Sequence, residues 1–571
     1  MKTKKLFTLF VISLVAAAAA FAQDKVQQID NLLKSYQEYG QFNGTVLVAE
    51  KGKVIYKKGF GIADMEWNIP NEADTKFRIG SVTKQFTAAL ILQLVEEGKI
   101  KLDSKLTDYL TDYRKDTGDK VTIHQLLNHT SGIPSYTSLP TFPAISRDPS
   151  SVQDFVKKYT SGDLEFEPGS KFAYNNSGYF LLGAIIEKVT GKTFAENLQT
   201  RILDRVGMTD TGYDLHGTVL NKRASGYEKT LGGYVNAAYL DMGLPYAAGS
   251  MYSTVEDLYK WDQSLYEDKI LTAASKKLMF TPGLENYGYG FVIEDKPIGK
   301  TAQKIKIITH GGGINGFNCL FTRAVDQKDT VLLLDNVGLG SYHAAITSSI
   351  IAILNGQPAE MPKKSISETL YKTANEKGGA AAAAEYRKLK SANSAMYNFA
   401  ESELNTLGYQ LLRGNKTDDA IEIFKLNVEM FPNGFNPYDS LGEAYLKAGN
   451  KELALVNYKK SVELNPENLA GTQMIKKIEG KETTVDPAIF DSYIGDYEIA
   501  PSFILTITKE NDKLFGQATG QGKLGLETVS NTQFINSAVK ATITFERDSA
   551  GKVTGLVLDQ GGRKMNAKKI K

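Results

Sequence analysis

A 34-residue internal repeat in the second half of the chain constrains its fold more than any other feature. Leu407-Gly408, Ala420, Phe424 and Pro432 recur, each shifted by 34 residues, as Leu441-Gly442, Ala454, Tyr458 and Pro466. Small and aromatic residues at such a period lock paired helices together in repeat proteins. The repeat therefore predicts a separate helical segment, and a chain of 571 residues is in any case too long for a single core.

The sequence on either side of the repeat has a different pattern. Residues 42–61 alternate polar and apolar around Lys51-Gly52-Lys53, which is typical of a β-hairpin. Residues 121–355 mix helical and strand-like segments, which favours an α+β domain whose sheet joins early and late parts of the chain. From Asp486 onward the alternation returns, which predicts a small antiparallel sheet or barrel.

The N-terminus has the pattern of a secretory signal peptide. Lys2, Lys4 and Lys5 precede an apolar run over residues 6–20, and Ala20-Phe21-Ala22 is a small-x-small cleavage site. The run is short for a membrane span, and no later segment replaces it. We therefore expect export to the periplasm or the medium, with no membrane span in the mature protein. An uncleaved N-terminal anchor is the alternative.

Charge and cysteine content exclude several classes of function. The chain has 67 basic and 65 acidic residues, and loss of the three lysines in residues 1–22 leaves the two signs nearly balanced. Nucleic-acid binding usually needs a broad basic excess, which this chain lacks. Cys319 is the only cysteine, so we expect no intramolecular disulfide, and its apolar surroundings FNCLF predict a buried packing residue.

Ser81 and Lys84 are the first candidates for chemistry. In RIGSVTKQFTAA, Ser81 opens a predicted buried helix, and Lys84 stands three residues later on the same face. A serine hydroxyl must lose its proton to a base as it attacks, and a lysine can accept that proton only if its pKa is lowered. The same spacing at Ser537–Lys540 and Ser549–Lys552 opens no predicted helix, so it does not align the two side chains.

A second segment supplies a partner for this pair. Tyr174 and Asn176, in FEPGSKFAYNNSGYF, follow a Pro-Gly turn and lead into an apolar helix. A tyrosine held near Lys84 would exist partly as phenolate and could take the Ser81 proton. Asn176 is a candidate donor to a substrate carbonyl.

A third segment ends a strand-like run with glycines. In KIKIITHGGGINGF the run leads into His310, Gly311, Gly312 and Gly313. Glycine there lets a substrate backbone approach the strand edge closely. The backbone N–H groups of Ser81 and Gly313 are candidates for an oxyanion hole.

These three segments, in this order, resemble the penicillin-recognising serine hydrolases: class C β-lactamases, D,D-peptidases and related esterases and D-aminopeptidases. The resemblance covers about residues 41–353 and includes the phrases LLNHTSGIPSY and AAGSMYSTVEDLYKW. It implies an α+β fold, an antiparallel sheet with helices on both faces, and acyl transfer without metal or organic cofactor.

The same resemblance implies a role for each residue. Ser81 is then the acylated nucleophile, Lys84 its base partner and Tyr174 the group that carries the proton to the leaving group. Asn176 and the glycine strand that follows His310 position the substrate.

His310 departs from the pattern of the true β-lactamases, which usually carry a lysine at that place. A histidine is mostly neutral at pH 7, so it supplies no fixed cation for a substrate carboxylate. This departure favours an ester or a D-amino-acid peptide or amide as the substrate, with β-lactams as a further candidate.

Three other interpretations have weaker support. His124 and His129 lack a third ligand at metal-binding spacing, so structural roles are favoured. Residues 311–316 fit G-x-G-x-x-G, but strand-like sequence follows instead of a helix, which disfavours a dinucleotide site. A non-catalytic peptide- or muropeptide-binding protein with a peptidase-like cleft is the remaining alternative.

The sequence therefore predicts five segments. The helical repeats resemble tetratricopeptide repeats, and the C-terminal segment resembles a lipocalin-like barrel. The segments are a signal peptide over 1–22, the hydrolase domain over 23–356, a linker over 357–379, the repeats over 380–482 and the barrel over 486–571. The repeat helices are a candidate surface for a protein partner, although packing of the C-terminal domain is the favoured role.

Overall fold

A computed structural model gives the fold of the chain. It describes residues 24–139, 141–392, 395–480, 487–500, 503–519, 522–536, 539, 541–560 and 563–570. The predicted signal peptide and the pair Ser537 and Lys540 lie outside these residues. The chain divides into two compact units, the first built from residues 1–229 and 234–362 and the second from residues 230–233 and 363–571.

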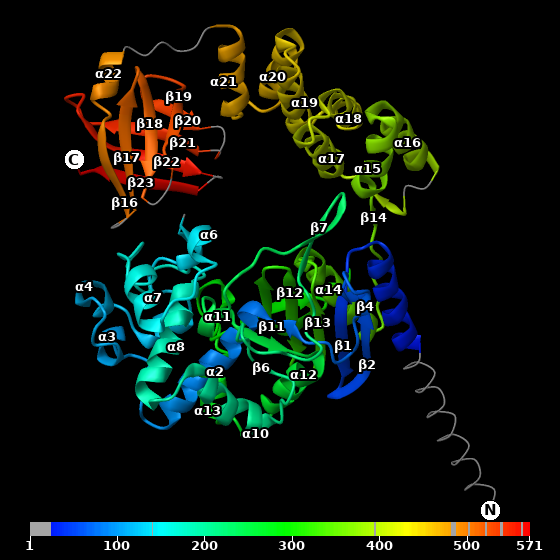
Figure 1. The fold of residues 1–571 in the computed structure, drawn as a ribbon, viewed down its shortest axis with the longest axis vertical. Coiled ribbons are helices and arrows are strands. Elements are labelled where there is room, and N and C mark those ends of the chain that lie inside the picture. The colour runs from blue at the N-terminus through cyan, green and yellow to red at the C-terminus, as the bar shows by residue number, and fades with distance from the viewer. Residues whose placement is uncertain are drawn as a thin grey trace, which may run out of the picture. The chain divides into compact units, whose positions relative to one another are not determined.

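The first unit is organised around a six-stranded antiparallel sheet (Figure 1). Its strand order is β10 (Val292–Pro297), β11 (Lys304–Ile314), β12 (Phe317–Ala324), β13 (Asp329–Asp335), β1 (Gly44–Glu50) and β2 (Lys53–Phe60). The predicted hairpin is thus β1–β2, and β1 pairs with β13 in register Val46↔Leu333. This confirms that the sheet joins early and late parts of the chain.

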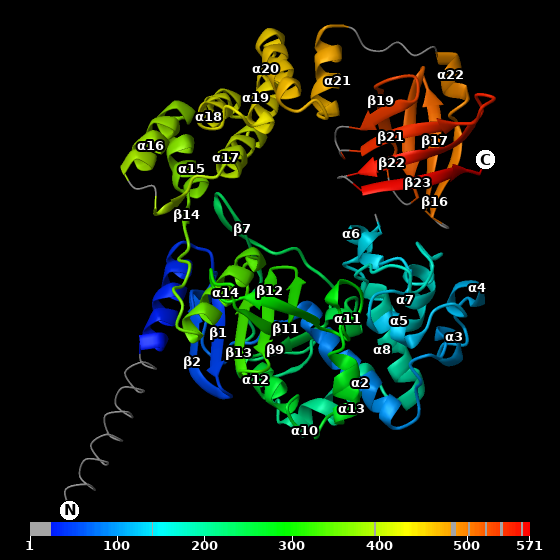
Figure 2. The ribbon, with the colours of Figure 1, turned by 180° about the vertical axis from the view of Figure 1, so that it is seen from behind.

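Helices cover both faces of this sheet, as predicted, because successive strand residues point to opposite sides. On β1, Leu47 and Ala49 join the core that contains α2 (Thr83–Glu96), α8 (Asn176–Thr190) and α12 (Val255–Ser264). Val46 and Val48 join the other core, with the helix over residues 24–38 and α14 (His343–Leu354). Figure 2 shows α14 and the sheet from behind.

The strand β11 comes unusually close to the segment that precedes α2. A Cβ atom on Gly312 would lie 2.0 Å from the Ile79 carbonyl oxygen and 2.5 Å from the Cys319 sulfur. A Cβ atom on Gly80 would lie 2.9 Å from the Gly313 nitrogen. Only glycine allows two backbones to approach this closely, so the glycines fix the distance between β11 and the start of α2.

The second unit begins with paired helices. They are α15 (Ile366–Lys377), α16 (Gly379–Ala392), α17 (Glu401–Arg413), α18 (Thr417–Met430), α19 (Phe435–Lys447), α20 (Lys451–Leu464) and α21 (Leu469–Ile478). Gly408 of α17 faces the Phe424 ring of α18, and Gly442 of α19 faces the Tyr458 ring of α20. These repeated small–aromatic contacts are those expected of the 34-residue repeat, whose assignment as a tetratricopeptide repeat stays a prediction.

The predicted linker over residues 357–379 is only partly extended. Residues 366–377 form α15, which buries Ile366, Leu370 and Ala374 in the core of the helical segment. Their spacing of four residues places them on one helix face, a pattern that the two prolines nearby obscured.

The C-terminal part of the second unit is a closed barrel of eight antiparallel strands, β16 to β23. The strands run from β16 (Gly495–Ala500) and β17 (Phe503–Glu510) to β22 (Val553–Gln560) and β23 (Arg563–Lys569). Tyr497, Ile507 and Phe545 are among the side chains that fill its interior. Ser549 lies in the turn between β21 (Ala541–Arg547) and β22, so it opens no helix.

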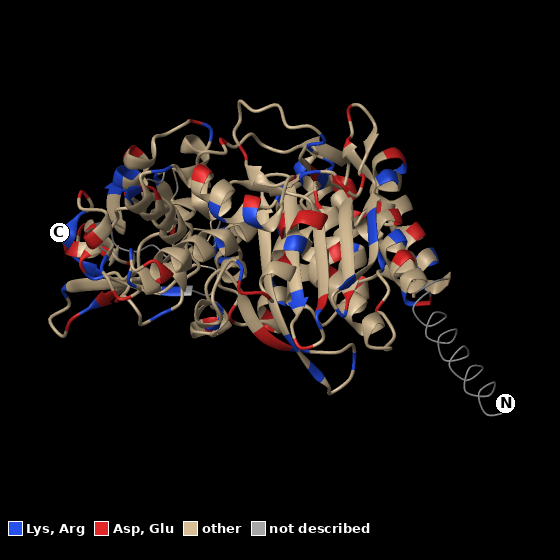
Figure 3. Cartoon of the chain, turned by 90° about the horizontal axis from the view of Figure 1, so that it is seen from below, with Lys and Arg blue, Asp and Glu red and all other residues tan. Residues whose placement is uncertain are grey.

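Residues of both charge signs occur throughout the described part of the chain. Basic and acidic residues are interspersed in the view of Figure 3, in agreement with the near-balanced composition. Across the described ranges, no helix combines the length and apolar character that a membrane crossing requires.

Replacing Gly312 by alanine should destabilise the first unit, because neither backbone can yield to the new methyl group. We expect a loss of roughly 1–3 kcal/mol in the free energy of unfolding. Gly311→Ala is the matched control, since a Cβ atom there would lie 3.7 Å from its nearest neighbour. Trp67 and Trp261, the two tryptophans, both lie in the first unit, so tryptophan fluorescence in urea reports its unfolding. Equal midpoints for the two variants would contradict this account.

Candidate active site

Ser81 lies in a short 3-10 turn, η1 (Gly80–Val82), directly before α2. Gly80 has a φ of 48°, a left-handed conformation that favours glycine. The turn packs against β11, so Ser81 stands beside the strand residue Gly313. Ser81 is partly exposed, whereas the residues of α2 that follow it are buried.

Lys84, in the first turn of α2, is fully buried and its amine has three polar neighbours. The Lys84 Nζ atom lies 2.8 Å from Asn176 Oδ1, 2.8 Å from the Ala248 carbonyl oxygen and 3.1 Å from Ser81 Oγ. Burial lowers the pKa of Lys84 well below its ordinary value, because the charged form is desolvated.

The chemistry of these neighbours sets the direction of proton transfer. A carbonyl oxygen and an amide oxygen only accept hydrogen bonds, so Asn176 and Ala248 each take one N–H of the amine. The orientation of Asn176 is fixed by its Nδ2 atom, which donates to Thr137 Oγ1 at 3.1 Å. The remaining lone pair of a neutral Lys84 amine therefore points at Ser81, the geometry that a general base for this serine requires.

The segment with Tyr174 and Asn176 is held by the residue between them. Asn175 caps α8 by accepting from the Gly178 N–H, and its own N–H donates to His129 Nδ1 at 3.1 Å. The His129 ring is buried and lies 4.4 Å from the Tyr174 ring, measured between centroids. His129 thus has a structural role in the site, as predicted.

The Tyr174 ring lies beside the reactive pair. Lys84 Nζ is 4.9 Å from the ring centroid, and hydrogen bonding with Ser81 lowers the pKa of the phenol. Desolvation has the larger effect and raises that pKa above its ordinary value, although 42% of the residue's surface is exposed. Burial thus favours the neutral phenol over the phenolate, and the role of Tyr174 in taking the Ser81 proton stays a prediction.

His310 directs neither ring nitrogen at Ser81. Its Nδ1 atom lies 2.6 Å from the Gly311 carbonyl oxygen, which only accepts, so the ring proton is on Nδ1. Nε2 therefore accepts from the Tyr287 hydroxyl at 2.8 Å. Burial, with a smaller effect from Lys84, lowers the pKa of His310 to about 3, so the ring is neutral at physiological pH.

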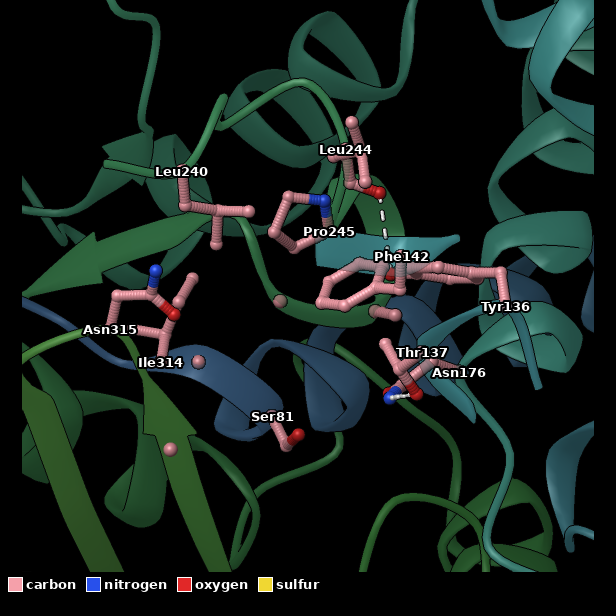
Figure 4. Close-up of a pocket in the computed structure, with 14 residues that line it drawn as sticks. Ser81, Tyr136, Thr137, Phe142, Asn176, Leu240, Leu244, Pro245, Ile314 and Asn315 are labelled. Atoms are coloured by element: carbon pink, nitrogen blue, oxygen red, sulfur yellow. Dashed lines mark hydrogen bonds between the residues drawn. The ribbon is translucent and has the colours of Figure 1, made fainter. Parts of the chain in front are cut away.

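A pocket opens above Ser81 and encloses about 550 Å³, including space open to solvent (Figure 4). Asn176 and Thr137 lie on one side of Ser81, and Ile314 and Asn315 on the other. Gly313 lines the pocket, whereas His310, Gly311 and Gly312 are not among its lining residues. The glycine strand therefore reaches the pocket through its last residues only.

Other candidates from the sequence have structural partners. Cys319 is buried, as predicted, and its sulfur lies 3.0 Å from the Ile79 carbonyl oxygen. His124 contacts the Tyr289 hydroxyl through Nδ1. Residues 311–316 belong to the antiparallel pair β11–β12, which is not the strand–helix unit of a dinucleotide site. Within the residues that the structure describes, no three metal-ligating side chains gather.

Comparison with known proteins gives the family of this domain. A family profile described as Beta-lactamase matches residues 29–338, more than half of the chain. The chain belongs to the β-lactamase family of serine hydrolases. A second profile, described as a domain of unknown function (DUF3471), matches residues 479–569.

Individual relatives agree with this assignment. Penicillin-binding protein 4* of Bacillus subtilis is 32% identical over 383 residues, which cover 61% of this chain and 82% of that protein. Teichoic acid D-alanine hydrolase of Staphylococcus aureus is 31% identical over 329 residues, which cover 55% and 74%. The crystal structure of D-amino acid amidase from Ochrobactrum anthropi SV3 superposes with a TM-score of 0.50 at 26% identity, covering 58% of this chain and 98% of that one.

The site also contains residues that the motifs did not single out. His129 and the Ala248 carbonyl lie within the two phrases quoted for the resemblance, and Thr137 directly follows the first phrase. Tyr287 lies in none of the segments, and its hydrogen bond to His310 and its ring contacts with His129 and Tyr174 identify it.

Replacing Lys84 by alanine should lower the rate of acylation by roughly 10²–10⁴-fold, the range for loss of a general base. Only the neutral amine accepts the Ser81 proton, so the wild-type rate should rise with pH and level off well below the ordinary lysine pKa of 10.5. Burst kinetics with a chromogenic ester measure this rate, with the exposed Lys192→Ala as control. An undiminished burst in Lys84→Ala would remove Lys84 from the mechanism.

Proposed function

We propose that the protein is an exported hydrolase that forms an acyl-enzyme on Ser81. Ser81 Oγ attacks a substrate carbonyl carbon while its proton passes to the neutral Lys84 amine. The backbone N–H groups of Ser81 and Gly313 bind the resulting oxyanion. The bond to the leaving group then breaks as Tyr174 donates its phenolic proton, and Lys84 returns a proton to Tyr174.

Water completes the cycle: it gives a proton to Lys84 as its oxygen attacks the acyl carbon, the bond to Ser81 Oγ breaks, and Lys84 returns the proton to Ser81 as the acid leaves. The hydrogen bonds of Lys84 carry this proposal. The two N–H groups of its neutral amine donate to Asn176 and Ala248, which leaves the lone pair facing Ser81. Asn176 orients Lys84 and borders the bound carbonyl, and the end of the glycine strand aligns the substrate.

The proposed substrate is an ester or an amide of the kind that D-amino acids form. The names of two relatives support it, a teichoic acid D-alanine hydrolase and a D-amino acid amidase. A β-lactam is the poorer candidate. His310 is neutral, and both of its ring nitrogens are hydrogen-bonded to the protein, so it supplies no cation for the carboxylate of a β-lactam.

Covalent labelling tests the nucleophile. A fluorophosphonate probe should label the wild type and leave Ser81→Ala unlabelled, whereas the exposed Ser150→Ala should label normally. With the same proteins, 4-nitrophenyl esters and N-acetyl-D-alanine amides should turn over faster than nitrocefin. Equal labelling of Ser81→Ala would exclude Ser81 as the nucleophile, and a preference for nitrocefin would overturn the proposed substrate class.

Export is tested by the N-terminus of the protein recovered from cells. Cleavage after Ala22 should give a mature chain that begins at Gln23, as mass spectrometry of the N-terminal peptide would record. A chain that retains residues 1–22 and stays with the membrane would instead support the uncleaved anchor.

A further inference from the structure

The pocket above Ser81 has an apolar wall. Phe142, Leu240, Leu244 and Pro245 line it opposite the nucleophile, and Ile314 lines it to one side of Ser81 (Figure 4). Of the described residues that line it, none carries a charge at neutral pH. We call this space the acyl pocket.

The polar groups of the same wall are already engaged by the protein. Both ends of the Asn176 amide are hydrogen-bonded: Oδ1 accepts from Lys84, and Nδ2 donates to Thr137. The Asn315 Nδ2 atom donates to the Ala238 carbonyl oxygen at 2.8 Å, and the Tyr136 hydroxyl donates to the Leu244 carbonyl oxygen at 3.3 Å. A carboxylate or an ammonium that entered would therefore lose its water without gaining an ionic partner.

The ionisable residues around the site are hydrogen-bonded to other groups of the protein. Arg78 Nε donates to Asp214 at 2.7 Å, and Asp241 accepts from the Gly243 N–H. Lys84 faces Ser81, Asn176 and Ala248, and both nitrogens of His310 are bonded to protein atoms. None of these groups is among the lining residues of the acyl pocket.

The position of Tyr174 decides which part of the substrate the pocket receives. Tyr174 is the proton donor to the leaving group, and neither Tyr174 nor His310 lines the pocket. In the proposed mechanism the leaving group therefore lies beside Tyr174, outside the pocket, and we assign the pocket to the acyl group.

We propose that this pocket selects an uncharged, apolar acyl group and rejects acyl groups that carry a carboxylate or a free ammonium. This inference rests on the proposed acyl-enzyme at Ser81 and narrows its substrate class. Among D-amino-acid derivatives, those with an acylated amine fit, whereas those with a free amine do not. Leu240 and Leu244 are the specificity-determining residues of the wall.

Two matched pairs of substrates test the proposal. The first is 4-nitrophenyl methyl succinate against 4-nitrophenyl hydrogen succinate, which share chain length and leaving group and differ by one negative charge. The second is N-acetyl-D-alanine 4-nitroanilide against D-alanine 4-nitroanilide, which differ by the positive charge of the amine. In each pair kcat/KM of the neutral member should be higher by on the order of 100-fold, since an unpaired charge would have to be desolvated.

A substitution in the pocket wall should change the ratio of kcat/KM between the neutral and the charged succinate ester. Leu240→Arg places a cation beside the acyl group, so the preference for the neutral succinate should fall about tenfold or more. Leu240→Met, which keeps size and neutrality, should retain the wild-type ratio. Fluorophosphonate labelling of each variant confirms that the site is folded, and Leu244→Arg with Leu244→Met repeats the test if Leu240→Arg fails to label.

The outcomes separate this inference from the proposed function. Ser81 labelling with equal kcat/KM for both members of a pair would overturn the neutral pocket and leave the acyl-enzyme standing. An Arg variant that labels normally but keeps the wild-type ratio would show that the wall does not set the preference. Absence of labelling and of turnover in the wild type would overturn both proposals.

Discussion

The site depends on the burial of one lysine. Burial of an ammonium costs free energy unless the group is fully paired. The polar neighbours of Lys84 are two oxygen acceptors and a hydroxyl, with no carboxylate among them. A carboxylate partner would have stabilised the charged form and removed the base. Neutral acceptors hold the side chain in place while desolvation lowers its pKa, so positioning and activation come from the same contacts.

That burial requires the surrounding elements to meet at close range. The start of α2 can lie against β11 only because Gly80 and Gly312 have no side chain. The same approach places Gly313 beside Ser81, at the position from which a backbone N–H could bind an oxyanion. A packing constraint on the fold therefore also fixes the geometry of the proposed chemistry.

Besides Lys84, the described residues of the site include no fixed cation. The Tyr287–His310 hydrogen bond and the Gly311 carbonyl oxygen hold the histidine as one neutral tautomer. With Lys84 desolvated, Tyr174 stays protonated and is suited to donate a proton. The pocket wall is also uncharged, which connects the departure at His310 with the proposed preference for uncharged acyl groups.

The sequence by itself determined the fold class, the hydrolase family and the three segments that carry Ser81, Tyr174 and the glycines. These follow from local patterns and from motifs whose residue types are uncommon together. It did not mark α15 as a helix of the packed segment, because three apolar residues at four-residue spacing are a weak signal beside two prolines.

Tertiary structure alone decided the hydrogen-bond partners of the site residues and the apolar wall of the pocket. Lys84 takes one acceptor from 92 residues away and another, a main-chain carbonyl, from 164 residues away. Main-chain groups and apolar side chains have no sequence signature of their chemistry, since their effect depends on burial and distance. The neutral His310 and the uncharged acyl pocket therefore became visible only when the chain was folded.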